Sequence, residues 1–205
     1  MRAFSFVFAA CLVAGPPVQA QTPGSPSPPP GPVEVAPVLP EPEPSRRERL
    51  DTLFAELKRE PETDKAKTIA DRIQALWSQS DSATVDLLMD RSATAIGKKD
   101  EAAALDLLDQ VIVLEPDYAE GWNRRATLHY AANRYGASMR DVEEVLKREP
   151  RHFGALMGLG AMQEELGRNR QALDTFSRAL SVYPALKAAQ DAVLRISDEL
   201  AGQPA

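Results

Sequence analysis

Residues 153–186 read FGALMGLGAMQEELGRNRQALDTFSRALSVYPAL, and this stretch decides how the chain folds. Leu173, Phe176 and Leu180 fall on one face of a helix, which indicates a buried stripe and not a cofactor site. Gly167 marks a turn before this helix. Pro184 ends it, because proline cannot donate to the preceding helical turn. The stretch therefore predicts two antiparallel helices joined by a short turn.

Three prolines extend this pattern towards the N-terminus. Pro116, Pro150 and Pro184 are spaced 34 residues apart, which divides the chain into the units 85–118, 119–152 and 153–186. Small residues at matching places let the two helices of a unit approach closely. Gly158 and Gly160 are interpreted as such a packing site, because no strand precedes them and no Lys-Ser or Lys-Thr follows them as in a phosphate loop.

The third unit resembles the tetratricopeptide repeat (TPR) pattern closely. A period of 34 residues is typical of these helix-turn-helix units, and the residues in register are Leu156, Leu159, Gly160, Gly167, Ala172, Phe176, Ala179 and Pro184. Arg125 and Arg91 depart from the pattern, because they stand where leucine is usual. A long arginine can lay its methylenes along the helix contact, so we expect the Arg125 guanidinium to lie in water.

The resemblance covers residues 85–186 well and residues 50–79 weakly. It implies an all-α fold, an α-solenoid of antiparallel helix pairs with about three TPR units. A degenerate helical pair at 46–84 precedes them, and a capping helix at 187–200 closes the open end.

The N-terminal residues 1–20 are predicted to be a signal peptide. Arg2 precedes an apolar stretch of about twelve residues, and Val18-Gln19-Ala20 offers a small-x-small cleavage pattern. Cleavage after Ala20 removes the chain's single cysteine, Cys11. Two alternatives stay open: lipidation at Cys11, and a retained membrane anchor, although the stretch is short for a bilayer span.

A proline-rich linker is predicted at 21–45, where ten prolines exclude regular helix and sheet. The segment is either a ligand for a polyproline-binding module or a spacer, and its composition favours the spacer. A periplasmic or secreted location follows from the signal peptide, with no stable membrane span after cleavage.

No catalytic, cofactor or metal motif is visible in the sequence. The formal net charge of −6 argues against nucleic acid as a partner, because phosphate contacts need a basic face. His129 and His152 have no His, Cys or Glu at zinc-site spacing. We therefore predict a non-enzymatic protein without cofactor or metal; the alternative is an enzyme with a site of no recognised pattern.

In TPR proteins the first helix of each pair lines a concave groove, and the resemblance lets the matching positions be named. We expect Met and Tyr to form an apolar floor and Asn and Arg to hold a peptide backbone or carboxylate. The candidates for the groove are Asp86, Met89, Asp90, Ala93, Asn123, Arg124, Thr127, Tyr130, Met157, Ala161 and Glu164, with Ile96, Glu120 and Gly154 beside them.

The predicted function is a scaffold or adaptor of the bacterial cell envelope that binds a segment or helix of another protein, and self-association stays open. The Lys/Asn/Arg clamp with which some TPR domains hold a C-terminal carboxylate is not reproduced, because Met89, Ala93 and Gly154 stand at several of its places. The alternative is a structural subunit of an envelope or secretion assembly. An exposed apolar patch away from the groove would favour that alternative.

Overall fold

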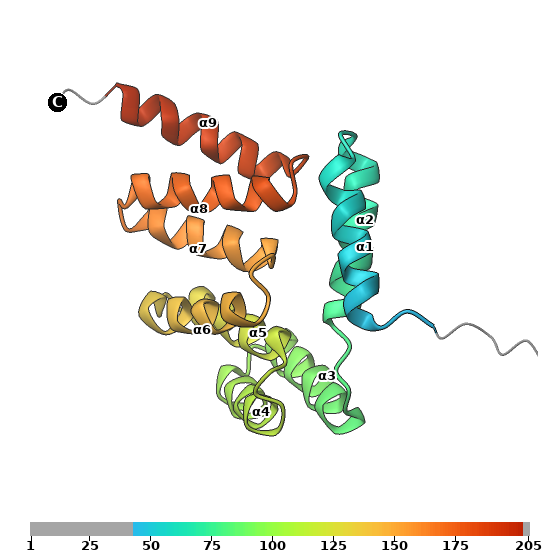
Figure 1. Ribbon diagram of the computed structural model, residues 1–205. Coiled ribbons are helices and arrows are strands. Elements are labelled where there is room, and N and C mark those ends of the chain that lie inside the picture. The colour runs from blue at the N-terminus through green and yellow to red at the C-terminus, as the bar shows by residue number, and fades with distance from the viewer. Residues whose placement is uncertain (1–42, 203–205) are drawn as a thin grey trace, which may run out of the picture. The chain divides into compact units, whose positions relative to one another are not determined.

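The structure is a computed structural model that describes residues 43–202. The predicted signal peptide at 1–20, with Cys11, and nearly all of the predicted linker at 21–45 lie outside the described residues. Within residues 43–202 the regular secondary structure is entirely helical, which confirms the predicted fold class (Figure 1). The helices are α1 (Arg46–Arg59), α2 (Thr63–Trp77), α3 (Ala83–Gly97), α4 (Glu101–Leu114), α5 (Ala119–Ala131), α6 (Tyr135–Arg148), α7 (Phe153–Glu165), α8 (Asn169–Val182) and α9 (Lys187–Ala201).

The turns inside the three central pairs share one backbone device. Lys99, Asn133 and Gly167 lie between α3 and α4, α5 and α6, and α7 and α8, and each has a positive φ of 59°, 57° and 70°. This left-handed conformation favours glycine and is tolerated by asparagine. The three residues are spaced 34 apart in the sequence, so the same turn is repeated at the period of the prolines.

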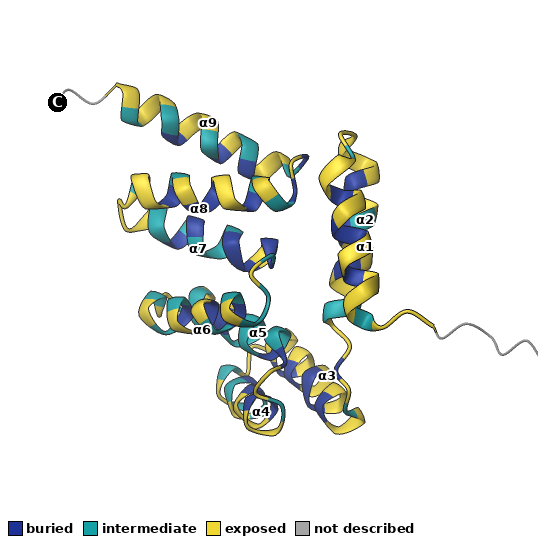
Figure 2. Cartoon of the chain, viewed as in Figure 1, coloured by how far each residue is buried: buried dark blue, intermediate teal, exposed yellow. Residues whose placement is uncertain are grey.

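Helices α3 to α9 pack in chain order (Figure 1). Each pair packs tightly within itself, and the second helix of one pair contacts the first helix of the next. Gly160 of α7 lies so close to Phe176 of α8 that an added Cβ would come within 2.6 Å of the ring. Buried residues lie on the helix faces that meet neighbouring helices, as the dark blue colouring in Figure 2 shows.

The N-terminal pair α1–α2 packs against the third unit and scarcely contacts α3. Its buried leucines and Phe54 pack in one cluster with Phe153, at the start of α7, and Tyr183, just after α8. The Trp77 ring stacks on His152, with ring centroids 4.2 Å apart. Tyr118 fixes the connection to α3, because its hydroxyl donates a hydrogen bond to the Ser78 carbonyl oxygen over 2.8 Å. The pair is therefore helical, but it does not extend the stack ahead of α3.

None of the helices found between residues 43 and 202 combines the length and apolarity that a membrane crossing requires.

Candidate binding groove between α5 and α7

A cavity of about 150 Å³ lies where α5, α6 and α7 meet. Its floor is apolar, with Ala126 and Met162 buried. Two glycines of α7 keep it open: a Cβ added at Gly158 would meet no atom within 4 Å, and one at Gly154 would meet only the His152 ring, at 3.4 Å. The lining residues are Asn123, Ala126, Thr127, Tyr130, Ser138, Val142, Gly154, Ala155, Gly158 and Met162.

Three of the predicted groove residues come together on this cavity: Asn123, Thr127 and Tyr130, one helical turn apart on α5. The Asn123 amide donates to the Glu120 carboxylate over 3.0 Å, and its carbonyl oxygen stays available as an acceptor. The Thr127 hydroxyl donates to the Asn123 backbone oxygen over 2.9 Å, and its own oxygen can still accept a hydrogen bond. These side chains offer a peptide backbone hydrogen-bonding groups beside an apolar floor.

The predicted groove residues of the first unit, and Arg124 of the second, do not line the cavity. Met89 is only 4% exposed and packs in the core with Val85, so the prediction that it offers an apolar floor is wrong. Arg124 donates to the Met89 backbone oxygen over 3.0 Å and so ties α5 to α3. Asp86 accepts from the backbone N–H of Ser80 and from its hydroxyl, and Asp90 and Ala93 are exposed on α3.

In the third unit, Met157 and Glu164 are engaged with their neighbours. Met157 is half-buried and packs against the clusters that join α7, α8 and α9. Glu164 pairs with Arg195 of α9. Ala161 is half-buried between them on α7. Only a minority of the predicted set therefore shares one hollow.

Tyr130 is held at one end of the cavity by a carboxylate that the sequence analysis missed. Tyr130 and Tyr135 both donate to Glu165, and their rings stack with centroids 5.7 Å apart. The hydrogen bond to Glu165 raises the pKa of Tyr130 to about 12, and the two hydroxyls hold the pKa of Glu165 below its usual value. The Tyr130 hydroxyl is thus occupied, and its ring is the part that faces the cavity.

Gly158 was also missed as a groove residue. The two glycines of α7 were interpreted together as a packing site, but only Gly160 is pressed against a neighbour. Gly158 is two residues earlier, about 200° away around the helix, and faces the open cavity. Because each residue of a helix is rotated by 100° from the one before, the sequence alone indicates that Gly158 and Gly160 lie on different faces and can have different roles.

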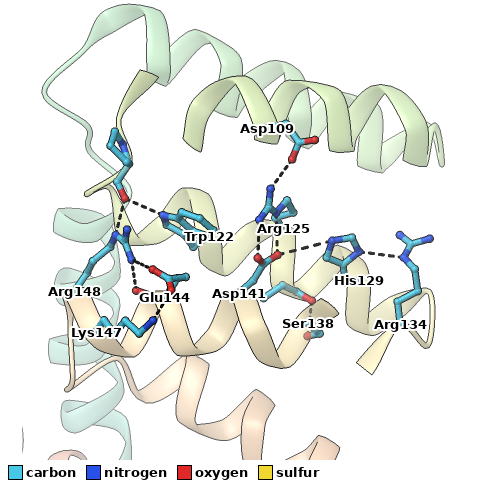
Figure 3. A network of polar contacts seen from close by, with 12 residues as sticks. Asp109, Trp122, Arg125, His129, Arg134, Ser138, Asp141, Glu144, Lys147 and Arg148 are labelled. Atoms are coloured by element: carbon cyan, nitrogen blue, oxygen red, sulfur yellow. Dashed lines mark hydrogen bonds and ion pairs between the residues drawn. The ribbon is translucent and has the colours of Figure 1, made fainter. Parts of the chain in front are cut away.

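A polar network backs the groove on the other side of α5 (Figure 3). Arg125 donates to both carboxylate oxygens of Asp141 on α6, over 2.9 and 2.6 Å, and to Asp109 on α4, over 2.6 Å. Its side chain is 20% exposed, so the expectation that the guanidinium lies in water is wrong. The hydrogen bonds that Arg125 donates to Asp141 outweigh the effect of burial and raise the pKa of Arg125.

The same network includes Trp122 and His129 (Figure 3). The guanidinium of Arg125 lies 5.0 Å from the centre of the Trp122 ring, and that of Arg148 lies 4.9 Å from it. His129 accepts a hydrogen bond from Arg134 at Nδ1, and burial lowers the pKa of His129. The network therefore links α5 to both α4 and α6 through side-chain hydrogen bonds.

The structure offers no metal centre within residues 43–202, because no three His, Cys, Asp or Glu side chains there converge closely enough to hold an ion.

Comparisons with known proteins give one strong sequence relative and several similar folds. No model of a known protein family matches the chain. A TPR repeat-containing protein of Rhizobium etli is 49% identical over 158 residues, which cover 77% of this chain and 78% of the relative. The first TPR of Spaghetti (RPAP3), solved with the HSP90 peptide SRMEEVD, aligns with a TM-score of 0.55 at 18% identity, over 60% of this chain and 97% of that one. MamA (AMB-1) aligns with a TM-score of 0.51 at 17% identity, over 76% of this chain and 82% of its own. At these identities the solved structures show a shared fold.

Proposed function

The chain belongs to the TPR repeat-containing proteins, and we propose that it is a non-enzymatic scaffold of the bacterial cell envelope that binds a segment of a partner protein in the groove between α5 and α7. TPR domains are scaffolds for protein and peptide binding, and the Spaghetti domain of similar fold was solved with a bound peptide. The proposal makes three specific claims, which concern the binding groove, the kind of partner segment and the location in the cell envelope.

The observation that carries the proposal is the open floor at Gly158. A helix position without a side chain and without a neighbour within 4 Å leaves room for an incoming group. Asn123 and Thr127 line the same cavity from α5, and each has an oxygen that can still accept a hydrogen bond. An apolar floor with polar groups at the rim is the usual arrangement of a peptide site.

The volume of the cavity limits how much of the partner segment can enter it. About 150 Å³ is smaller than the roughly 300 Å³ at which small-molecule sites begin, so the hollow takes one side chain. Because the floor consists of Ala126, Val142 and Met162, the anchor is an aliphatic residue such as leucine or methionine. The backbone on either side of the anchor would bind to Asn123 and Thr127.

A phage-displayed peptide library selected on the protein tests the groove. Gly158→Phe fills the cavity from its open side, and we expect it to lower the affinity of selected peptides by about tenfold or more. Gly136→Phe is the matched control, since Gly136 is an exposed glycine of α6 that does not line the cavity. If selected peptides bind Gly158→Phe as tightly as the control, the groove is not the binding site.

The envelope location is supported by the signal-peptide pattern of residues 1–20. Its test is independent of the groove. The full chain is expressed with its own N-terminus, the periplasm is separated from the cytoplasm, and the mature N-terminus is sequenced. A periplasmic protein that begins at Gln21 is expected, and an uncleaved cytoplasmic protein would contradict the location while leaving the groove unaffected.

A second candidate function, a structural subunit of an envelope assembly, is favoured by exposed apolar side chains away from the groove. Val113 is 79% exposed at the end of α4, beside Leu114, and Leu194 is 64% exposed on α9. Sedimentation of the native chain and of Val113→Asp tests it. Self-association that Val113→Asp abolishes would favour the structural subunit. If the native chain is a monomer at all concentrations, the structural subunit is ruled out and the groove scaffold is the function that remains.

A further inference from the structure

Helix α3 begins the continuous stack, and its outer face is left uncovered. In the later pairs the first helix is pressed against the second helix of the pair before it. Gly121 of α5 lies so close to Val111 of α4 that an added Cβ would come within 2.7 Å of the valine. Ala155 of α7 is 2% exposed and packs in one cluster with Val145 of α6. The residue at this place in α3, 34 positions before Gly121, is Leu87, and it is 50% exposed.

Two charged residues belong to the same face. On α5, Arg124 donates to a backbone oxygen of α3 and Arg125 donates to Asp109 of α4, so both reach back to the pair before them. Their counterparts on α3, also 34 positions earlier, are Asp90 and Arg91. Both are exposed, and neither forms an ion pair with any residue between 43 and 202. The face has the residues of a stacking contact, but the pair α1–α2 does not cover it, because that pair packs against the third unit.

The opposite end of the stack, at α9, differs in its charges. Lys187 pairs with Asp191, and Arg195 pairs with Glu164 of α7. Leu194 is 64% exposed beside these pairs. Because both cations of α9 are already neutralised within the chain, this end offers no unpaired charges of opposite sign to a second copy.

We propose that the outer face of α3 binds the same face of a second copy of this chain. The two helices run antiparallel about a two-fold axis that passes between Asp90 and Arg91. Asp90 of each copy then faces Arg91 of the other copy, so the face is complementary to itself. Leu87 of each copy faces the methyl group of Thr94 of the other. An axis at Leu87 would bring the two leucines together but would leave all four charges without partners, so the charges favour the first arrangement.

The length of α3 limits the strength of this contact. The helix has 15 residues, so its outer face measures about 22 Å by about 10 Å. This area is well below the roughly 800 Å² per partner that a stable interface buries. We therefore expect a weak dimer with a dissociation constant of about 10–100 μM.

The test is sedimentation equilibrium of the full chain, with a reducing agent present because Cys11 could otherwise link two copies. Asp90→Arg gives each copy two cations on the face, and Arg91→Asp gives each copy two carboxylates. Each change acts twice in a two-fold dimer, so we expect either variant to raise the dissociation constant about tenfold or more. The double variant Asp90→Arg/Arg91→Asp exchanges the signs and should bring the dissociation constant back to within about threefold of the native value. An equimolar mixture of the two single variants should also dimerise, since two cations then face two carboxylates.

Leu87→Asp should dissociate the dimer as well, and Leu194→Asp is its control, because it makes the same change at an exposed leucine of α9. The proposal fails if the full chain is a monomer at every concentration, or if neither the double variant nor the mixture recovers the dimer. It also fails if Leu194→Asp weakens the dimer as much as Leu87→Asp. A dimer that Val113→Asp dissociates and Leu87→Asp does not would place the contact on α4 and contradict the proposal.

Discussion

The second and third helix pairs repeat the same positions with different chemistry. Arg125 of α5 pairs with Asp141 of α6, and the residues 34 positions later are Leu159 of α7 and Thr175 of α8. The Thr175 hydroxyl donates instead to Gln163 of α7 over 2.7 Å. Asp141 and Thr175 are both buried. One backbone arrangement thus accepts a buried ion pair in the second unit and a neutral hydrogen bond in the third.

The close approach of the helices shows the same pairing. In the third unit Gly160 faces Phe176, and in the second unit Ala126 and Val142 stand at these places. The large ring needs a neighbour without a side chain, while the smaller valine leaves room for a methyl group. Substitutions that move one member of a pair between the units should therefore destabilise the fold, and moving both should restore it.

The largest effect is expected for Arg125→Leu, which brings the residue of the third unit into the second. It leaves the buried carboxylate of Asp141 without its partner, and we expect a loss of about 3 kcal/mol in the free energy of unfolding. Arg125→Leu/Asp141→Thr introduces both residues of the third unit, leaves no buried carboxylate without a partner, and should recover most of the loss. Urea unfolding followed by circular dichroism at 222 nm measures both.

Arg91→Leu is the matched control, because Arg91 stands 34 residues before Arg125 and is exposed on α3. Its effect should be within about 0.5 kcal/mol. If Arg125→Leu is as mild as this control, or if the double variant is no better than the single one, Asp141 does not depend on Arg125 and the comparison of the two units is wrong.

A smaller effect is expected for Gly160→Ala. The added Cβ would lie 2.6 Å from the Phe176 ring, so overpacking should cost about 1–2 kcal/mol after the gain in helix propensity. Gly158→Ala is the control on the same helix and should stabilise by roughly 0.5–1 kcal/mol, since its Cβ enters open space. Thermal and urea unfolding compare the two.

The double variant Gly160→Ala/Phe176→Val copies the second unit into the third. It should be less destabilised than the sum of its single changes, because valine vacates the space that the new methyl group needs. A stabilising Gly160→Ala, or strict additivity in the double variant, would show that the close contact with Phe176 does not limit this position.

The repeat period predicted the helices, their pairing and the capping helix position, because these depend on local turns and on the apolar face of each segment. It did not predict which surface α1–α2 covers, since the stacking of Trp77 on His152 joins residues 75 positions apart and follows from no local pattern. Export and the unit boundaries stay predictions.

Site residues were harder to predict for a related reason. Met89 and Asn123 occupy the same register in their units, yet Met89 is buried and Asn123 borders the cavity. The position of a residue in the repeat predicts on which face of its helix the residue lies. It does not predict which side chains the neighbouring helices place opposite that face. Arg125 is the clearest case, because its guanidinium is held by carboxylates on α4 and α6.

The smallest effect is a difference in pH dependence at His129, whose place in the third unit is taken by Gln163. Burial lowers the pKa of His129 below its ordinary value of 6.5, and Arg134 and Arg125 act in the same direction against Asp141. The unfolded chain therefore binds the proton more readily than the folded one, and stability falls as the pH drops below 6.5. In His129→Gln this contribution is removed, while the glutamine oxygen can still accept from Arg134. Between about pH 7.5 and about pH 5.5 the free energy of unfolding should fall more for the native chain than for His129→Gln. If the free energy of unfolding, measured by urea unfolding, changes equally with pH in the two proteins, then His129 is protonated as easily in the folded protein as in the unfolded chain.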